Sequence, residues 1–305
     1  SEAGLILWHV RRSYREDQRT MDAGHQMDGK ICLVTGATSG VGLFTALGLA
    51  QRGAEVVLVG RRLDRTEAAA ELLEAQAGKP PKDLLTADLS GLDGVRALAD
   101  QVRRRLPRLD VLVNNAGGFF LRRDETVDGL ERTFALNHLS YFLLTNLLLD
   151  LLQSTPRARI VNVASDSHRS ARIHFDDLQL RRGYNPWRAY ANSKLGNVWF
   201  TYELARRLPG KRITVNALTP GMVATNLGKQ NLLIRPILSL GYALLGKPPV
   251  QGAETPVYLA SSPEVEEVSG WYFVDKVQVP SSRQSYDEAA ARRMWDLSAA
   301  LAGVG

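Results

Sequence analysis

The stretch Ile31-Cys32-Leu33-Val34-Thr35-Gly36-Ala37-Thr38-Ser39-Gly40-Val41-Gly42 decides the fold of this 305-residue chain. Its four apolar residues, 31–34, predict a short strand that is buried on both faces, as strands of a parallel sheet are. The glycines of the G-x-x-x-G-x-G turn permit a tight bend and a close approach of the backbone to a ligand. Because a helical pattern begins directly after the turn, the first amides of that helix would bind an anion. The stretch therefore predicts a phosphate-binding turn between a strand and a helix.

Short apolar runs of this kind recur along the chain and alternate with longer amphipathic stretches. The further strands predicted in this way are residues 55–59, 111–113, 160–163 and 214–216. The predicted helices are residues 42–52, 65–77, 91–106, 130–152 and 191–208. The alternation predicts an α/β fold, a single doubly wound (Rossmann) domain with a mostly parallel sheet flanked by helices. We expect this domain to span residues 30–303, after an N-terminal extension of residues 1–29.

Composition and charge narrow the classes of function. Lysine and arginine give a formal net charge of +6, but the arginines form scattered pairs rather than a basic stripe, so we expect no nucleic-acid partner. A single cysteine, Cys32, excludes an internal disulfide and favours a reducing compartment. The five histidines lack metal-ligand spacing, and we expect no metal. No run approaches the roughly 18 apolar residues of a membrane-spanning helix. These features predict a cytoplasmic protein, and they leave open a membrane association through a surface contact or an anchor upstream of Ser1.

The end of the second predicted strand indicates which dinucleotide the turn would bind. An NAD site usually has a carboxylate here for the ribose 2′-hydroxyl, and Val59-Gly60-Arg61-Arg62 has none. The guanidinium of Arg61 would instead pair with a 2′-phosphate, and the Ser39 hydroxyl would add a donor. This predicts NADP (NADPH) as the cofactor. The alternative is that Arg61 is an ordinary solvated side chain.

Tyr190 and Lys194 form a candidate proton-transfer pair. They are four residues apart in a predicted helix, so they share one face. A phenol is too weak an acid to exchange protons at neutral pH, and a nearby ammonium favours the phenolate and lowers the phenol pKa. Such a pair suits proton transfer to or from a carbonyl or alcohol oxygen. Taken alone, a Tyr-x-x-x-Lys spacing occurs often by chance.

Several short motifs accompany this pair in order along the chain. They are Asp88-Leu89-Ser90, Asn114-Asn115-Ala116-Gly117, Asn137-His138, Val161-Asn162-Val163-Ala164-Ser165 and Pro220-Gly221-Met222-Val223-Ala224-Thr225. With the glycine turn, the set resembles the short-chain dehydrogenase/reductase family over roughly residues 29–302. Within that family the chain looks most like the retinol dehydrogenase branch, on stretches such as Ser193-Lys194-Leu195-Gly196-Asn197-Val198 and Ser269-Gly270-Trp271-Tyr272-Phe273. Phe119-Phe120 departs from that branch beside the nicotinamide pocket, and this leaves the substrate in doubt.

The resemblance implies a role for each matching residue. Tyr190 would be the general acid in reduction, Lys194 would support it and hold the nicotinamide ribose, Ser165 would bind the substrate oxygen, and Asn137 would hold a water linked to Lys194. Asp88 and Asn115 would contact the adenosine. The complete predicted cofactor-binding set is Gly36, Ser39, Gly40, Val41, Gly42, Arg61, Asp88, Asn115, Ala116, Gly117, Tyr190, Lys194, Pro220, Gly221, Val223 and Thr225.

These residues predict an NADP(H)-dependent oxidoreductase that interconverts a carbonyl and an alcohol on an apolar substrate, which is retinoid-, steroid- or lipid-aldehyde-like. The alternatives are a non-catalytic NADP-binding regulatory protein on the same fold and a protochlorophyllide reductase-like enzyme. The segment of about residues 226–247 is rich in apolar residues and predicts a substrate lid. The alternatives are that it packs in the core or forms a patch that lies on a membrane surface. The substrate, the preferred direction and the oligomeric state stay open, a homodimer included.

Overall fold

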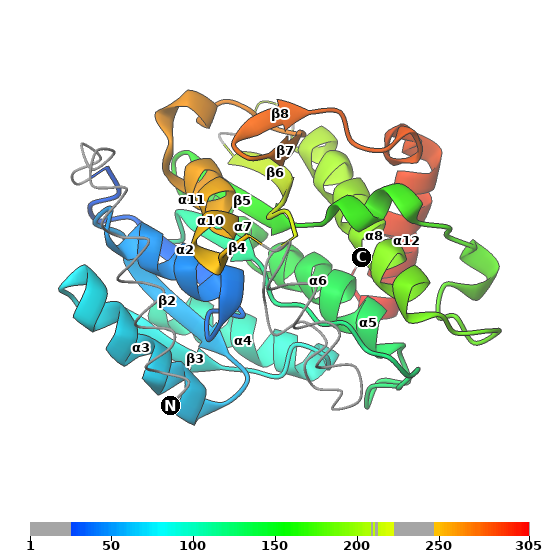
Figure 1. Ribbon diagram of the computed structural model, residues 1–305, viewed down its shortest axis with the longest axis horizontal. Coiled ribbons are helices and arrows are strands. Elements are labelled where there is room, and N and C mark those ends of the chain that lie inside the picture. Colours follow the sequence, from blue (N-terminus) through cyan, green and yellow to red (C-terminus); the bar gives the residue numbers. More distant parts are fainter. Residues whose placement is uncertain (1–25, 209, 211–212, 223–246, 305) are drawn as a thin grey trace.

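The computed structural model describes residues 26–208, 210, 213–222 and 247–304. They build a single sheet of eight strands in the order β3-β2-β1-β4-β5-β6-β7-β8 (Figure 1). The strands are β1 (Ile31–Thr35), β2 (Glu55–Gly60), β3 (Asp83–Thr86), β4 (Val111–Asn114), β5 (Ala158–Val163), β6 (Ile213–Thr219), β7 (Tyr272–Val274) and β8 (Val277–Val279). All neighbours pair in parallel except β7 and β8, which form an antiparallel edge. The predicted doubly wound α/β fold is confirmed.

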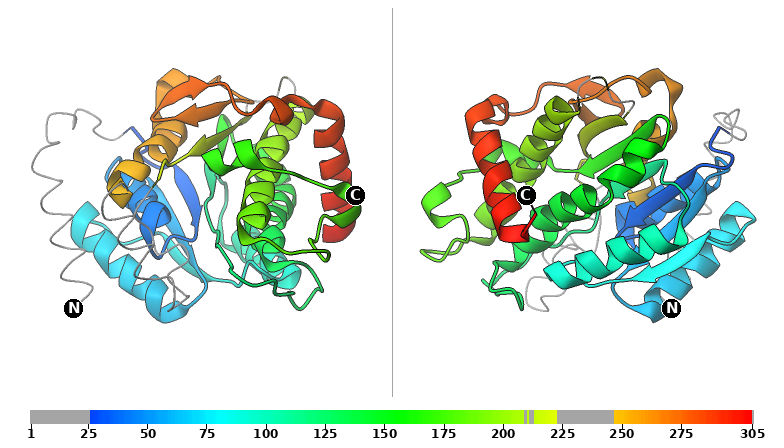
Figure 2. Two further views of the ribbon diagram at one scale, coloured as in Figure 1. Left: turned by 45° about the vertical axis from the view of Figure 1, so that its right-hand side comes forward. Right: turned by 180° about the vertical axis from the view of Figure 1, so that it is seen from behind.

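Helices cover both faces of the sheet (Figures 1 and 2). One face carries α2 (Gly40–Ala50), α3 (Leu63–Ala77), α10 (Pro249–Gly252) and α11 (Glu254–Ser261), and α2 contacts each of the other three. The other carries α4 (Leu92–Arg105), α6 (Ser140–Leu147), α7 (Leu149–Ser154), α8 (Pro186–Arg207) and α12 (Glu288–Ala302). Each layer buries its own apolar cluster against the sheet.

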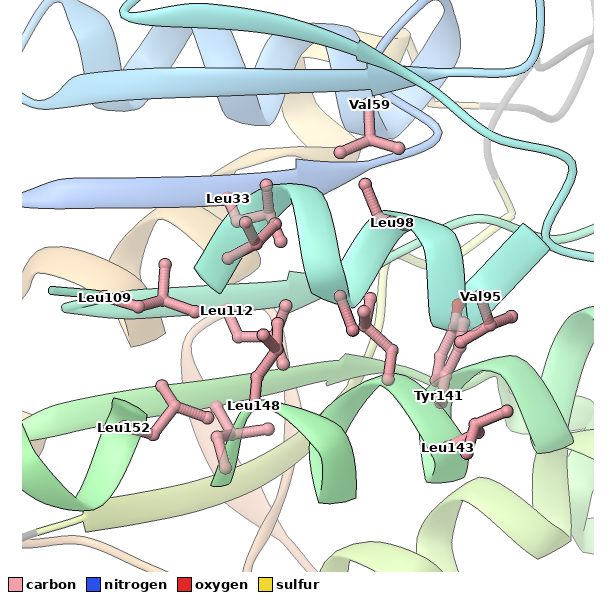
Figure 3. Packing of buried hydrophobic residues seen from close by; sticks show 14 of the residues in the cluster. Leu33, Val59, Val95, Leu98, Leu109, Leu112, Tyr141, Leu143, Leu148 and Leu152 are labelled. Carbon is pink, nitrogen blue, oxygen red and sulfur yellow. The ribbon is translucent and has the colours of Figure 1, made fainter. Parts of the chain in front are cut away.

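The central strands contribute alternate residues to the two clusters. In β1, Leu33 packs with α4 and α6, whereas Cys32 and Val34 pack with α2 and α3 on the opposite face. Figure 3 shows Leu33, Leu112 and Leu98 of α4 in the first of these clusters. A strand with helices on both sides needs apolar residues at almost every position, and this explains the continuous apolar runs in the sequence.

Three strands and the helices α10, α11 and α12 were absent from the sequence prediction. The strands β3, β7 and β8 each keep exposed or half-buried positions, so their sequences are not continuously apolar. They lie toward the two edges of the sheet, where one neighbour is missing or short. The helix α12 covers α8 on the outer side of its layer. Elements with one exposed side carry a weaker hydrophobic signal.

The prediction of one helix over residues 130–152 is wrong. The structure has a short helix, α5 (Arg132–Phe134), a π-helical turn over Ala135–Leu139, then α6 and α7. The buried Glu131 begins this run, because its carboxylate accepts the amides of Thr133 and Phe134, both at 2.8 Å. A π turn inserts an extra residue into a helix and is frequent at functional sites.

Residues 26–29 belong to the packed domain even though the sequence analysis assigned residues 1–29 to an extension. Met27 is 5% exposed and lies in the cluster that contains Cys32. Its amide donates to the carbonyl of Arg52 at 2.9 Å. Residues 1–25 lie outside the described part of the chain, as do residues 226–246 of the predicted lid. Across the described residues, no helix combines the length and the apolarity needed to cross a membrane.

Candidate active site

The predicted site residues follow the carboxyl ends of neighbouring parallel strands. The glycine turn follows β1, Arg61 follows β2, Asp88 follows β3, Asn115–Gly117 follow β4, Ser165 follows β5 and Pro220-Gly221 follow β6. Parallel strands end at one edge of a sheet, so the fold brings these positions into one row. The strand order reverses between β1 and β4, and ligands of open α/β sheets bind outside this reversal point.

The glycine turn is packed so tightly against the end of β4 that side chains are excluded. A Cβ on Gly42 would lie 2.4 Å from the carbonyl oxygen of Gly36 and 2.3 Å from Nδ2 of Asn115. Gly36 also has a φ of +66°, which side-chain-bearing residues rarely adopt. Asn115 holds the turn, since its Nδ2 donates to the carbonyl of Thr35 at 2.8 Å. The close approach leaves the start of α2 as a cradle of backbone amides.

The start of α2 has the chemistry of an anion site. Ser39 is the N-cap residue, yet its side chain makes no capping hydrogen bond and is exposed. The first turn of the helix contains no acidic residue. Free amides and the positive end of the helix dipole favour a phosphate here. These residues, with Gly40 and Val41, fit the diphosphate of a dinucleotide.

The two arginines after β2 differ in their surroundings. Arg62 is engaged by Asp64, with 2.6 Å between Nη2 and Oδ2. Arg61 is exposed and makes no ion pair or hydrogen bond with any described residue. Burial of Asp88 opposes ionisation, but hydrogen bonds from Ser90 and the charge of Arg61 lower the pKa of Asp88. Arg61 and Asp88 follow the neighbouring strands β2 and β3, in which Gly60 is paired with Thr86.

Tyr190 and Lys194 lie on one face of α8, as the spacing predicted. Nζ of Lys194 is 5.6 Å from the centre of the Tyr190 ring and 5.7 Å from that of Tyr141. It donates to the carbonyl of Val163, the last residue of β5, at 2.9 Å. Burial between these rings lowers the pKa of Lys194 to about 7. The ammonium form of Lys194 can therefore lose a proton, and its amine form can gain one, near neutral pH.

Asn137 joins three segments of the site. Its Oδ1 accepts the amide of Gly118 at 2.8 Å, and its Nδ2 donates to the carbonyl of Gly118 and to Oγ of Ser193. Its own carbonyl accepts Nδ2 of Asn197 at 2.8 Å. The side chain is therefore occupied in holding the chain after β4 against the π turn and α8. This placement adds a structural duty to the predicted role of Asn137 in holding a water.

Ser165 and His168 stabilise the turn that follows β5 by hydrogen bonds. Ser165 caps the 3₁₀ turn Asp166–Ser170, with its Oγ accepting the amide of Ser167 at 3.2 Å. Nε2 of His168 accepts the amide of Ser282 at 3.0 Å, so Nδ1 carries the proton that bonds the carbonyl of Ser165 at 2.7 Å. Burial lowers the pKa of His168 and keeps it neutral. Both ring nitrogens of His168 are occupied, so it is not a base for Ser165.

A buried chain of polar groups behind Asn137 was not found by sequence reasoning. Asn197 accepts from Nδ1 of His138 at 3.2 Å, and Nε2 of His138 lies 2.9 Å from Oγ of Ser298 in α12. Burial lowers the pKa of His138 to about 4, so the ring is neutral. Asn137-His138 and Asn197 are visible in the motifs, but no local signal points to Ser298, 160 residues away. This series of hydrogen-bonded side chains connects α12 to the site.

Of the other predicted residues, some lie in the described part of the chain and some do not. Gly221 has a φ of +76° and its amide lies 3.2 Å from Oγ1 of Thr219, at the end of β6 beside Pro220. Val223 and Thr225 lie outside the described residues. Cys32 is fully buried in β1, and burial raises its thiol pKa. In the part of the chain that the structure describes, no three His, Cys, Asp or Glu side chains gather as a metal site would require.

The buried Lys194 gives the protein a pH-dependent stability. The pKa of Lys194 is about 7 in the native state and about 10.4 in an unfolded chain. Between these values the unfolded chain holds a proton that the native state lacks, so the free energy of unfolding rises with pH. We expect Lys194→Met to reduce this slope by about 1 kcal/mol per pH unit between about pH 7 and pH 10. Urea unfolding of both cofactor-free proteins measures it, and parallel curves would contradict the expectation.

Comparison with known proteins agrees with this architecture. A family model described as short chain dehydrogenase matches residues 30–233. Human retinol dehydrogenase 14 is 45% identical over 321 residues, which cover 99% of this chain and 96% of that protein. A crystal structure of an uncharacterized protein from Mycobacterium paratuberculosis is 34% identical, with a TM-score of 0.74 over 91% of this chain and 94% of its own. The NADP complex of Pseudomonas aeruginosa RhlG is 28% identical, with a TM-score of 0.65 over 82% and 96%.

The family model covers about two thirds of the chain, and the relatives named retinol dehydrogenase cover most of it. The strand order described above gives this chain a mostly parallel, doubly wound sheet. The chain belongs to the short-chain dehydrogenase/reductase family, in its retinol dehydrogenase-like branch.

Proposed function

We propose that the chain is an NADP(H)-dependent oxidoreductase that interconverts an aldehyde or ketone with an alcohol on an apolar, retinoid-like substrate. The observation that carries the proposal is the position of Tyr190 and Lys194 on α8, with Lys194 held by Val163 beside the end of β5. The relatives named retinol dehydrogenase support an apolar alcohol or aldehyde as substrate.

Each side chain would manage one part of the reaction. NADPH, when bound, supplies a hydride to the carbonyl carbon. The Tyr190 hydroxyl donates a proton to the substrate oxygen, and the Ser165 hydroxyl orients that oxygen by a hydrogen bond. The charge of Lys194 stabilises the phenolate that Tyr190 becomes. In oxidation of the alcohol, the same residues accept the proton.

The cofactor cradle would hold a dinucleotide by its phosphates. The amides of Gly40, Val41 and Gly42 fit the diphosphate, and the guanidinium of Arg61, which pairs with no described residue, fits a 2′-phosphate. Asp88, beside Arg61, fits the adenine. Several solved neighbours were crystallised with NADP, and this supports the choice of cofactor.

Turnover with defined substrates tests the proposal. NADPH oxidation is followed with all-trans-retinal, a steroid ketone and hexadecanal, and NADP⁺ reduction with the matching alcohols. Turnover of one of these pairs supports an oxidoreductase of apolar carbonyls. Tight NADPH binding without turnover of any compound, in either direction, would instead indicate a regulatory protein.

The choice between NADPH and NADH tests Arg61. Arg61→Asp places a negative charge where the 2′-phosphate would lie, so we expect the preference for NADPH, measured as the ratio of kcat/KM values, to fall by on the order of 10- to 100-fold. Arg62→Asp is the matched control, because Arg62 is already engaged by Asp64. Equal effects of the two substitutions would assign the preference to general charge and not to Arg61.

A further inference from the structure

Three aromatic side chains form a row beside the candidate active site. The ring of Phe119 lies 4.7 Å from that of Trp187 and 5.7 Å from that of Tyr190, edge-on to the latter. Trp187 and Tyr190 are three residues apart in α8, so they share one face of that helix. Phe119 comes from the segment after β4, on the other side. The three rings, which we call the aromatic row, connect Tyr190 to the protein surface.

The row is buried in its middle, at Phe119, and exposed at one end, at Trp187. Phe119 is 6% exposed, Tyr190 is half-buried, and Trp187 is 64% exposed. Exposing this much of an indole leaves a large apolar surface in water that a ligand would gain by covering. A single exposed apolar residue is usually unremarkable. Here it continues a row that ends at the residue proposed to transfer the proton.

Polar contacts order the chain segments that carry the row on both sides. The Tyr184 hydroxyl donates to the carbonyl of Phe120 at 2.8 Å, and the guanidinium of Arg132 lies 4.5 Å from the centre of the Phe120 ring. Asn185 caps the first turn of α8 through the amide of Arg188 at 3.0 Å. A surface that is ordered before binding loses little conformational entropy when a ligand covers it.

We infer that Trp187 and Phe119 bind the apolar part of the substrate, and that they make the enzyme selective for flat, unsaturated chains over saturated ones. The inference rests on the proposed function, because the substrate oxygen must lie at Tyr190 for proton transfer. The apolar chain then leaves Tyr190 along the row. A conjugated chain stacks on an indole with a quadrupole attraction that a saturated chain of similar area lacks.

The test compares one unsaturated and one saturated aldehyde, all-trans-retinal and hexadecanal, under saturating NADPH. We expect Trp187→Ala to raise the KM for retinal about tenfold, with a much smaller change in kcat. The selectivity, kcat/KM for retinal over that for hexadecanal, should fall about fivefold, the usual worth of an aromatic pair. Trp187→Phe should restore at least half of the selectivity. Trp271→Ala is the matched control, since Trp271 is 42% exposed but precedes β7, at the amino end of a strand parallel to β6, whereas the site lies at the carboxyl ends of the strands.

A second readout does not depend on turnover. Acrylamide quenching of tryptophan fluorescence is measured in the presence of NADP⁺ and retinal, a pair that cannot react. We expect retinal to protect a component of the emission that is present in the wild type and absent from Trp187→Phe. An unprotected Trp187 together with unchanged selectivity would overturn the inference while leaving the proposed function intact. Weaker binding to phosphatidylcholine vesicles with unchanged selectivity would also overturn it and assign Trp187 to a membrane surface. A wild type that turns over neither aldehyde would remove the proposed function and the inference with it.

Discussion

Tyr190→Phe is expected to lower kcat by about 10²- to 10⁴-fold, the usual contribution of general acid–base catalysis. The substitution removes one oxygen and keeps the ring, so its contact with Phe119 at 5.7 Å is retained. The cradle at the start of α2 is untouched, and the NADPH dissociation constant should change by less than threefold. Steady-state kinetics and NADPH fluorescence titration measure the two effects.

Tyr258→Phe provides the control for this experiment. Tyr258 lies in α11, on the opposite face of the sheet from α8, and its hydroxyl donates to Glu264 at 2.9 Å. Removing that hydroxyl should leave kcat unchanged, because no site residue contacts it. Near-normal turnover by the Tyr190 variant would contradict the proposed proton transfer without affecting the family assignment.

Gly42→Ala should weaken NADPH binding on the order of 10²-fold and should destabilise the protein by about 1–3 kcal/mol. The added Cβ would lie 2.4 Å from the carbonyl oxygen of Gly36, which is backbone and cannot rotate away. The turn must open, and opening it also displaces Nδ2 of Asn115 from Thr35. Isothermal titration calorimetry and thermal unfolding measure the two losses.

Gly91→Ala is the matched control for the glycine turn. A Cβ at Gly91 would make ordinary contacts, the nearest at 3.5 Å with Val127. Its φ of −106° suits any residue. We expect NADPH affinity within threefold of wild type and a small loss of stability from the poorer helix cap. Full NADPH binding by Gly42→Ala would show that the turn relaxes and is not the rigid cradle described here.

The centre of the fold could be predicted from sequence because burial on both faces demands apolar residues at every position. The runs at β1, β2 and β5 carry this signal, and so does the glycine turn between β1 and α2. The strands β3 and β8 were missed because at least half of their positions are polar or exposed, and β7 was missed because it is only three residues long. The helix over residues 130–152 was predicted unbroken because the bond from Asn197 to the carbonyl of Asn137 comes from 60 residues away.

Some features of the site could likewise be predicted from local sequence, whereas others depend on contacts between distant segments. Residues that follow strand ends, such as Arg61 and Ser165, could be placed together once the strands were known to be parallel. The lowered pKa of Lys194 could not be predicted, because it depends on Tyr141 and Val163 closing around the ammonium. The aromatic row forms because the segment after β4 packs against the start of α8. The local sequence of neither segment predicts this contact.

The link between His138 and Ser298 can form only after nearly the whole chain has been synthesised. A ribosome adds about 5–20 residues per second, so His138 waits roughly 10–30 s before Ser298 exists. During that time the strands β1–β6 can pair, while Leu195 and Trp199 of α8 lack the cover that Met294 of α12 later supplies. A nascent chain at this stage exposes the apolar face of α8 to solvent. A chain truncated before Glu288 would keep that face exposed to chaperones and proteases.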